Sequence, residues 1–232
     1  MKRLLFLVLV FNIIVASGQN DSVSICGKVA DFDDRPVKNA LVMLKGENFG
    51  GFVDTTYSDR HGFYSLKVKR GWYSGMAVID MEDYGKSKLE FWAFEIPAFE
   101  NLNIDARYDR LEIYGLNVFE IQGAYPGYTI YFRPMSLTRI LSADMEVNIP
   151  EIAPPPEQLE IRVEINGETV NVNHIQRVEE FAGEQMLYAF LIHTDPGKES
   201  AGKYDMIRIS ARDRGNGDRG EAICFRERSR YE

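Results

Sequence analysis

The side chains best suited to bind a ligand in this sequence are four aromatic residues beside predicted turns. Trp72 and Tyr73 follow the basic stretch 67–70, while Tyr125 and Tyr128 flank a Pro-Gly pair. An exposed indole or phenol ring can stack on the C–H face of a sugar, although most aromatic residues pack into a core. We therefore hypothesise a glycan-binding role for Trp72, Tyr73, Tyr125 and Tyr128, with core or inter-domain packing as the alternative.

The sequence carries no recognisable pattern for catalysis or transition-metal binding. No HExxH, CxxC or Gly-x-Ser-x-Gly motif occurs, although zinc enzymes and serine hydrolases depend on such spacings. The three histidines are widely separated along the chain: His61, His174 and His193. We therefore predict no catalytic residue, no metal site and no cofactor.

Two acidic clusters leave calcium binding open as an alternative to an acidic turn. Calcium prefers several oxygen ligands close together, but Asp and Asn also stabilise turns through their own side chains. The clusters are Asp31, Asp33 and Asp34, and Asp213, Asn216 and Asp218. The acidic turn is the favoured interpretation of both.

The start of the chain has the pattern of an export signal. Lys2 and Arg3 precede an apolar run over residues 4–15, and small residues follow at 16–18. This pattern is typical of a cleaved secretory signal peptide, here residues 1–18. The apolar run is shorter than the about 20 residues of a spanning helix. We expect a periplasmic or extracellular protein without a transmembrane segment after cleavage.

The net charge limits the possible partners, and the two cysteines allow at most one disulfide within the chain. The formal net charge is -8, and removing the two basic residues of the signal makes it more negative. An acidic chain repels phosphate backbones, so we predict no nucleic-acid partner. Cys26 and Cys224 lie near opposite ends of the chain. They could form a disulfide in an oxidising compartment, or they could be two separate small apolar residues.

The remaining sequence predicts β-strands. Apolar and polar residues alternate over 159–165, which indicates a half-buried strand. The Asn166-Gly167 pair that follows favours a type I′ hairpin turn. The continuous run Phe91–Phe94 predicts a strand buried on both faces. Further strands are expected at 130–132, 186–193, 204–211 and 222–225.

A proline-rich stretch indicates a domain boundary. Residues 148–157 contain four prolines, and proline cannot donate to a sheet and favours an extended linker. The predicted organisation is a signal peptide at 1–18, a sandwich at 19–141, a linker or lead-in strand at 142–157 and a second sandwich at 158–232.

The first predicted sandwich resembles a known family. Its matching elements are Gly27-Lys28-Val29, the turn 33–37, the strand 39–42, the segment 54–56 before the third strand and the turn 59–64. In this pattern Gly62 takes a positive φ, Asp59 caps the turn, and Val29, Val42 and Phe63 face a shared core. The segment resembles the carboxypeptidase regulatory-like domain, a prealbumin-like β-sandwich common in exported proteins of Bacteroidetes-type bacteria.

The end of the chain resembles a bacterial immunoglobulin-like domain. The supporting pattern is the alternating strand 202–213 followed by the turn Gly215-Asn216. Together the two resemblances imply an all-β protein of two tandem β-sandwiches, prealbumin-like and then immunoglobulin-like. They imply a non-enzymatic structural, adhesive or accessory protein of the bacterial cell envelope, with a protein or glycan partner. A glycan-binding accessory protein of polysaccharide utilisation and a hydrolase with a non-obvious site stay open as alternatives.

Overall fold

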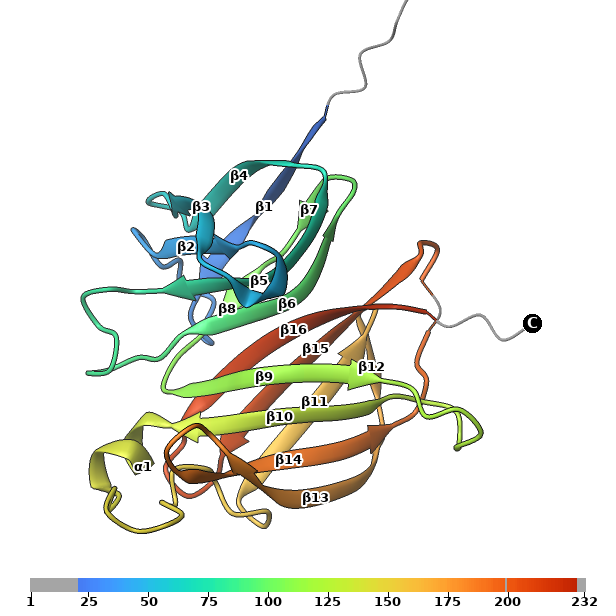
Figure 1. Cartoon of the computed structure of the whole chain (residues 1–232). Coiled ribbons are helices and arrows are strands. Elements are labelled where there is room, and N and C mark those ends of the chain that lie inside the picture. The colour runs from blue at the N-terminus through green and yellow to red at the C-terminus, as the bar shows by residue number, and fades with distance from the viewer. Residues whose placement is uncertain (1–20, 199, 229–232) are drawn as a thin grey trace, which may run out of the picture.

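The computed structural model describes residues 21–198 and 200–228, and nearly all regular structure in these residues is β-strand (Figure 1). The predicted signal peptide lies outside the described residues. Within the described part of the chain, no helix has the length and apolar character needed to cross a membrane. The all-β class predicted from the sequence is confirmed.

The first sandwich comprises two sheets. One has the order β4-β1-β7, with β8 also pairing with β1, and the other contains β3-β2-β5-β6. A short 3-10 helix, η1 (Glu47–Phe49), lies between β2 and β3. The strands are β1 (Ser22–Ala30), β2 (Leu41–Lys45), β3 (Phe52–Tyr57), β4 (Phe63–Lys69), β5 (Gly71–Ile79), β6 (Phe91–Ala98), β7 (Leu102–Asn103) and β8 (Ala106–Arg107).

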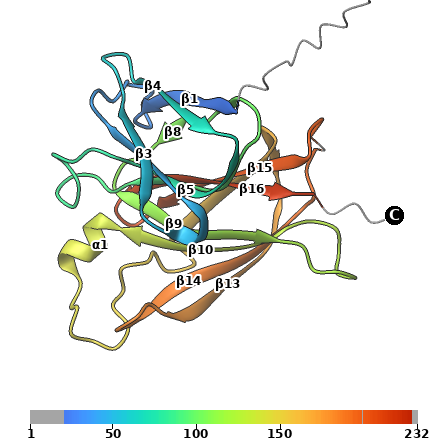
Figure 2. The ribbon, with the colours of Figure 1, turned by 45° about the horizontal axis from the view of Figure 1, so that its top comes forward.

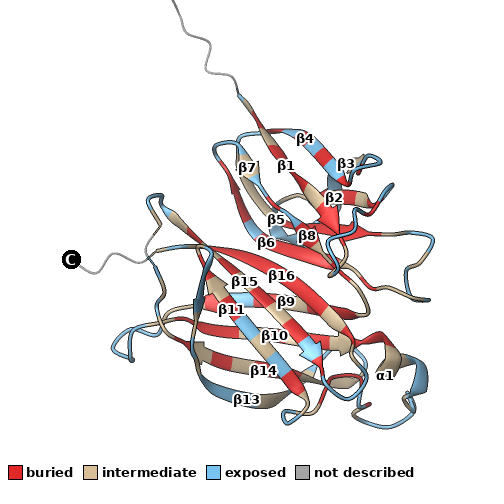
Figure 3. Cartoon of the chain, turned by 180° about the vertical axis from the view of Figure 1, so that it is seen from behind, coloured by how far each residue is buried: buried red, intermediate tan, exposed pale blue. Residues whose placement is uncertain are grey.

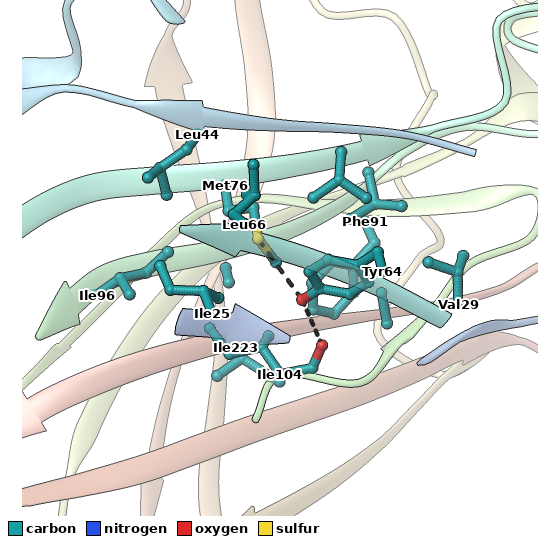
Figure 4. Close-up of a cluster of buried hydrophobic side chains, with 14 of the residues drawn as sticks. Ile25, Val29, Leu44, Tyr64, Leu66, Met76, Phe91, Ile96, Ile104 and Ile223 are labelled. Atoms are coloured by element: carbon teal, nitrogen blue, oxygen red, sulfur yellow. Dashed lines mark hydrogen bonds between the residues drawn. The ribbon is translucent and has the colours of Figure 1, made fainter. Parts of the chain in front are cut away.

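The core of this sandwich is apolar and includes the buried hydroxyl of Tyr64. Ile25, Leu44 and Met76 are among its fully buried side chains, and burying each contributes roughly 1.5–3 kcal/mol. The hydroxyl of Tyr64 donates to the carbonyl of Ile104 at 2.7 Å, so its polar end is satisfied inside the core (Figure 4). The cluster also includes residues of the last strand of the chain.

The second sandwich is built the same way. One sheet has the order β13-β14-β10-β9, and the other contains β12-β11-β15-β16. A short helix, α1 (Leu137–Ser142), follows β10. The strands are β9 (Leu111–Phe119), β10 (Thr129–Ser136), β11 (Leu159–Ile165), β12 (Glu168–Val170), β13 (Val172–Phe181), β14 (Met186–Thr194), β15 (Tyr204–Asp213) and β16 (Arg219–Glu227).

A single eight-stranded sheet runs through both sandwiches. Its order is β12-β11-β15-β16-β6-β5-β2-β3, and the join is a parallel pairing of β16 with β6. The two remaining sheets cover its opposite ends, so β1 and β4 lie at one end of the molecule and β13 and β14 at the other (Figures 1 and 2).

The two joining strands are buried on both faces. Ile223 and Phe225 of β16 pack into the first core, while Ala222 and Cys224 pack into the second. Figure 3 shows β16 buried along most of its length. The side chains of β6 are also buried alternately in the two cores. The predicted burial of Phe91–Phe94 on both faces is confirmed. Each joining strand therefore belongs to two cores at once.

The structure differs from the division of the chain that the sequence predicted. Residues 111–136 were assigned to the first sandwich, yet β9 and β10 pair with each other and β10 pairs with β14. The proline-rich segment 142–157 connects α1 to β11 within the second sandwich. Alternating residues identify a strand but leave its sheet open, because the pairing partner is distant in sequence.

Local turn predictions agree with the structure, with one correction. Gly62 has a φ of 82°, and the Asp59 carboxylate accepts hydrogen bonds from the backbone N–H groups of His61 and Phe63 at 2.8 and 2.9 Å. Asn166 and Gly167 both have positive φ, as a type I′ turn requires. Phe63, however, is 57% exposed rather than in the core, because the buried face of β4 begins at the next residue.

Cys26 and Cys224 do not pair. Both are free thiols, with Cys26 half-buried and Cys224 buried. Cys26 lies on β1 in the sheet that closes the first sandwich, whereas Cys224 lies in the shared sheet and packs into the second core. The interpretation as two separate small apolar residues therefore holds.

Candidate functional site

A cleft opens where β6 and β16 separate. Their pairing ends at Phe94 and Cys224, although β6 continues to Ala98 and β16 to Glu227. The space has a volume of ≈ 650 Å³, which is within the usual range of binding sites, about 300–1,000 Å³. We call it the junction cleft; it is lined by Phe49, Trp72, Phe94, Glu95, Tyr114–Val118 and Cys224–Glu227.

Two residues of β6 explain why the strands separate. Glu95 has a φ of 54° in the middle of the strand, a left-handed conformation that interrupts a regular ladder. Pro97 follows two residues later, and proline has no N–H to donate to a neighbouring strand. The separation of β6 from β16 therefore follows from the residues of β6 itself.

The opposite wall of the cleft is irregular as well. Gly115 of β9 has a φ of 64°, and the pairing of β9 with β10 shifts between Tyr131 and Arg133. Such an irregularity bends a strand and is over-represented beside functional sites. Backbone irregularities on both walls are the first reason to regard the junction cleft as the candidate site.

Aromatic rings packed on one another form the apolar part of the cleft. The ring of Phe49 stacks on Phe94 with centroids 6.1 Å apart and an interplanar angle of 12°. Tyr114 meets Phe94 edge-on at 6.3 Å. The backbone N–H of Phe49 donates to the hydroxyl of Ser74 at 3.0 Å, which fixes η1 over β5. The faces of these rings are thus largely covered by other rings.

Two opposite charges in the cleft lack a direct partner within the described part of the chain. The Nε of Arg226 is buried and has no hydrogen-bond partner among the described residues. Glu95 lies nearby; desolvation raises the pKa of its carboxyl, and the positive charge of Arg226 partly offsets this. A buried donor without an acceptor carries a cost in free energy, which an acceptor supplied at this position would offset.

Other arginines near the junction are fully engaged in ion pairs. The buried carboxylate of Glu221 accepts from Arg107 of β8 at 2.9 Å and also pairs with Arg208 of β15. This cluster ties the first sandwich to the second. Asp205 likewise pairs with Arg228. Against this background, the Nε of Arg226 stands out as a donor at the junction with no acceptor among the described residues.

A second cavity shares Phe225 with the junction cleft. It has a volume of ≈ 450 Å³ and is lined by Pro97, Phe99, Glu100, Leu102, Gly202, Lys203, Tyr204 and Phe225. Trp72 stands beside it: its ring centroid is 5.4 Å from that of Tyr204 and 6.2 Å from that of Phe99. These three rings come from both sandwiches and form an aromatic cluster across the junction.

The structure separates the four aromatic residues predicted as a binding site. Trp72 and Tyr73 are half-buried, and Tyr73 packs against the first core with its hydroxyl donating to the carbonyl of Lys69 at 2.8 Å. Tyr125 is 72% exposed. Tyr128 is only 3% exposed and therefore cannot offer a ring face to solvent.

Tyr128 has a structural partner instead of an external ligand. Its hydroxyl donates to the carboxylate of Asp205 at 2.7 Å. Burial raises the pKa of Tyr128, and this hydrogen bond raises it further. The stacking partners of Trp72, namely Phe99 and Tyr204, were not identified from the sequence because they are remote along the chain.

The acidic clusters are arranged as turns. The Asp31 carboxylate accepts the backbone N–H groups of Asp33 and Arg35, and it pairs with the Arg35 side chain at 2.7 Å. Asp213 pairs with Arg139 at 2.6 Å. The carboxylates of Asp31 and Asp213 thus accept hydrogen bonds from donors of the protein itself.

Asp218 sits at the centre of the largest of these networks. Its carboxylate accepts from Arg110, Ser136 and Thr138, with four hydrogen bonds between 2.6 and 3.1 Å. Asn216 donates to the same Ser136 hydroxyl at 3.0 Å. Because α1 begins at the residue after Ser136, this network positions the α1 segment.

The histidines are not gathered into a centre. His61 receives a hydrogen bond from Arg60 at 2.9 Å in its turn. His174 and His193 lie opposite each other on β13 and β14. No group of three or more His, Cys, Asp or Glu side chains suited to a metal ion occurs in residues 21–198 and 200–228.

A buried pair of glutamates was not anticipated from the sequence. The Glu112 carboxylate accepts from the indole N–H of Trp92 at 3.0 Å. Burial raises the pKa of Glu112 well above its ordinary value, and the charge of Glu90 adds to this. Burial also raises the pKa of Glu90. Glu112 consequently retains its proton to a higher pH than an exposed glutamate.

Comparisons with known proteins yield weak similarities. No family model matches the chain, and no curated protein matches it. Similar solved structures include BcpA, the major pilin subunit of Bacillus cereus, at 12% identity, covering 88% of this chain and 69% of the pilin, with a TM-score of 0.29.

Two other solved structures are similar to a comparable degree. A DUF3823 family protein from Parabacteroides merdae is 9% identical, with a TM-score of 0.29. The match covers 88% of this chain and 98% of that protein. The major pilin SpaD from Corynebacterium diphtheriae has 8% identity, coverage of 88% and 64%, and a TM-score of 0.28. Similarities this weak carry no argument about function.

Proposed function

We propose that this chain is an exported, non-enzymatic structural or adhesive protein of the bacterial cell envelope. The observation that carries the proposal is the eight-stranded sheet shared by the two sandwiches. Strands buried on both faces leave no hinge between the sandwiches. Such a body holds its clefts and loops in fixed positions, which suits attachment and scaffolding.

The ion pairs of the buried acidic side chains support the non-enzymatic part of this proposal. Asp205, Asp213, Asp218 and Glu221 are all buried, and each pairs with arginine. A catalytic acid or base must be within reach of a substrate. These carboxylates instead connect strands and loops to one another.

The family assignments belong to the same proposal. We infer a prealbumin-like, carboxypeptidase regulatory-like first sandwich and an immunoglobulin-like second one. The positive φ of Gly62, the capping role of Asp59 and the burial of Val29 and Val42 support the first. The alternating burial of β15 supports the second.

Fractionation and envelope binding test the proposal. The full chain, expressed in a bacterial host, should be recovered outside the cytoplasm with its first 18 residues removed. The purified protein should then co-sediment with isolated cell-envelope fragments. The amount bound should reach a plateau as the protein concentration is raised. Retention in the cytoplasm, or the absence of saturable binding to envelopes, would contradict the proposal.

Glycan binding is a second candidate, favoured by the aromatic cluster beside the second cavity. Trp72, Phe99 and Tyr204 provide aromatic surface there, and Lys203 and Glu100 supply polar groups for hydroxyls. A glycan array would test it with Trp72→Ala and Phe99→Ala as the variants and Tyr125→Ala as a control. A hit lost in Trp72→Ala and in Phe99→Ala, but kept in Tyr125→Ala, would place a sugar at the aromatic cluster beside the second cavity.

A further inference from the structure

The walls of the junction cleft include strand edges as well as side chains. Tyr114–Val118 of β9 and Cys224–Glu227 of β16 line it as unbroken runs. Successive side chains of a strand point to opposite faces, so a cavity that met only one face would be lined by alternate residues. Consecutive lining residues indicate that the main chain itself borders the cleft.

The edge of β16 is open to a further strand at this position. On one side Phe225–Glu227 pair with β15, and on the other side the pairing with β6 has ended. Successive N–H and C=O groups of a strand alternate between its two sides. Some main-chain groups of Phe225–Glu227 therefore point into the cleft, where Pro97 and the turned backbone of Glu95 do not complete the ladder.

The side chains in the cleft define the charge of an occupant. The buried Nε of Arg226 has no acceptor among the described residues, and a carboxylate is the acceptor that best matches a guanidinium. Glu95 at the opposite wall would accept from a donor. A peptide that alternates apolar and charged residues can meet both groups and keep apolar side chains against Phe94 and Leu116.

A sugar fits this cleft less well than a peptide. Stacking on a sugar requires an uncovered ring face, but Phe94 is 5% exposed and is covered by Phe49 and Tyr114. The half-buried ring of Trp72 packs against Phe99 and Tyr204. Main-chain edges present a regular row of donors and acceptors that matches another extended backbone. They are the groups by which proteins bind an added β-strand.

We propose that the junction cleft binds an extended peptide segment of a partner protein, which adds to the edge of β16 and places a carboxylate against Arg226. The segment would extend the shared sheet into the fork between β16 and β6. This inference rests on the proposed envelope function and supplies the way in which the protein holds its partner.

Selection from a phage-displayed library of random short peptides tests the proposal on the full protein. Enriched peptides should lack proline and should contain an acidic residue. Their apolar residues should alternate with charged residues. Arg226→Met keeps the apolar stem but removes the charge, and it should weaken binding of a selected peptide about 10- to 100-fold. Arg212→Met, at an exposed site on β15, should leave binding unchanged.

Two changes to the peptide act as controls that do not depend on a protein variant. Replacing its acidic residue with the matching amide should reproduce the loss seen with Arg226→Met. Replacing a central residue with proline should abolish binding, because an N–H of the added strand is lost. Hydrogen exchange should show new protection of amides within Phe225–Glu227 when the peptide binds.

Several results would overturn the proposal. These are the absence of any enriched peptide, binding that Arg226→Met leaves intact, or protection confined to another strand. Arg226-dependent binding to a glycan array would replace the peptide with a sugar. Envelope binding that survives Arg226→Met would overturn the cleft as the binding site while leaving the envelope function standing, so the two failures are distinguishable.

Discussion

Replacing Ile223 with alanine should destabilise both sandwiches. Ile223 lies on β16, which belongs to the sheet shared by the two sandwiches, and its fully buried side chain packs into the first core. Its neighbours Ala222 and Cys224 pack into the second. A cavity beneath this strand should therefore weaken contacts on both sides of the sheet.

The expected loss follows from the three carbons removed. At ~0.8 kcal/mol per buried carbon, the transfer contribution is about 2.4 kcal/mol. The remaining cavity adds to this, and buried Ile→Ala changes typically cost about 2–5 kcal/mol in unfolding free energy. For a chain of this size, a loss of about 3 kcal/mol should lower the melting temperature by roughly 6–12 °C.

Denaturant unfolding combined with hydrogen exchange is the appropriate assay. Amide exchange should accelerate in β1 and β4 of the first sandwich and in β11 and β15 of the second by a similar factor. Ile175→Ala is the matched control, because Ile175 is 43% exposed on β13, and such a surface change should fall within about 0.5 kcal/mol.

Either of two outcomes would refute this reasoning. A loss below about 1 kcal/mol would mean that Ile223 does not support a packed core. Faster exchange confined to β1 and β4, with β11 and β15 unchanged, would mean that the sandwiches unfold independently.

Three further predictions concern buried polar groups and thiols. Glu112→Gln should be more stable than the wild type by a margin that grows from about pH 5 to pH 8, because stability held by a carboxyl of raised pKa is lost as pH rises; thermal melts of both proteins across this range would show it, and a margin independent of pH would contradict it. Asp218→Ala should lower the unfolding free energy on the order of 3 kcal/mol, since it removes four hydrogen bonds to a buried carboxylate; a loss within the error of denaturant titration would contradict it. Iodoacetamide should label Cys26 of the native protein slowly and Cys224 only after unfolding, and mass spectrometry without reduction should show no intramolecular disulfide.

The features predicted correctly from the sequence are local ones. The alternation over 159–165 gave β11, and Asn166-Gly167 gave its turn. Asp59 and Gly62 form the turn that their residue types favour. In each case the physical cause acts within a few neighbouring residues: alternation places side chains on two faces, and Gly or Asn accepts a positive φ.

The features that could not be predicted depend on contacts remote in sequence. The pairing of β6 with β16 joins residues 92–94 to 222–224, and no local pattern specifies that partner. Phe91–Phe94 did show two-faced burial, but not what covers each face. The unpartnered Nε of Arg226 likewise becomes apparent only when the surrounding strands are placed, because its environment comes from β6 and β9.

The most direct test of the central claim is whether the two sandwiches move as one body. Residual dipolar couplings of backbone amides, measured in a weakly aligned sample, report the orientation of each strand relative to a common frame. A single alignment tensor should fit the amides of β1 and β4 together with those of β10 and β14. Two tensors of different magnitude or orientation for the two sandwiches would contradict the shared rigid sheet on which the proposed function depends.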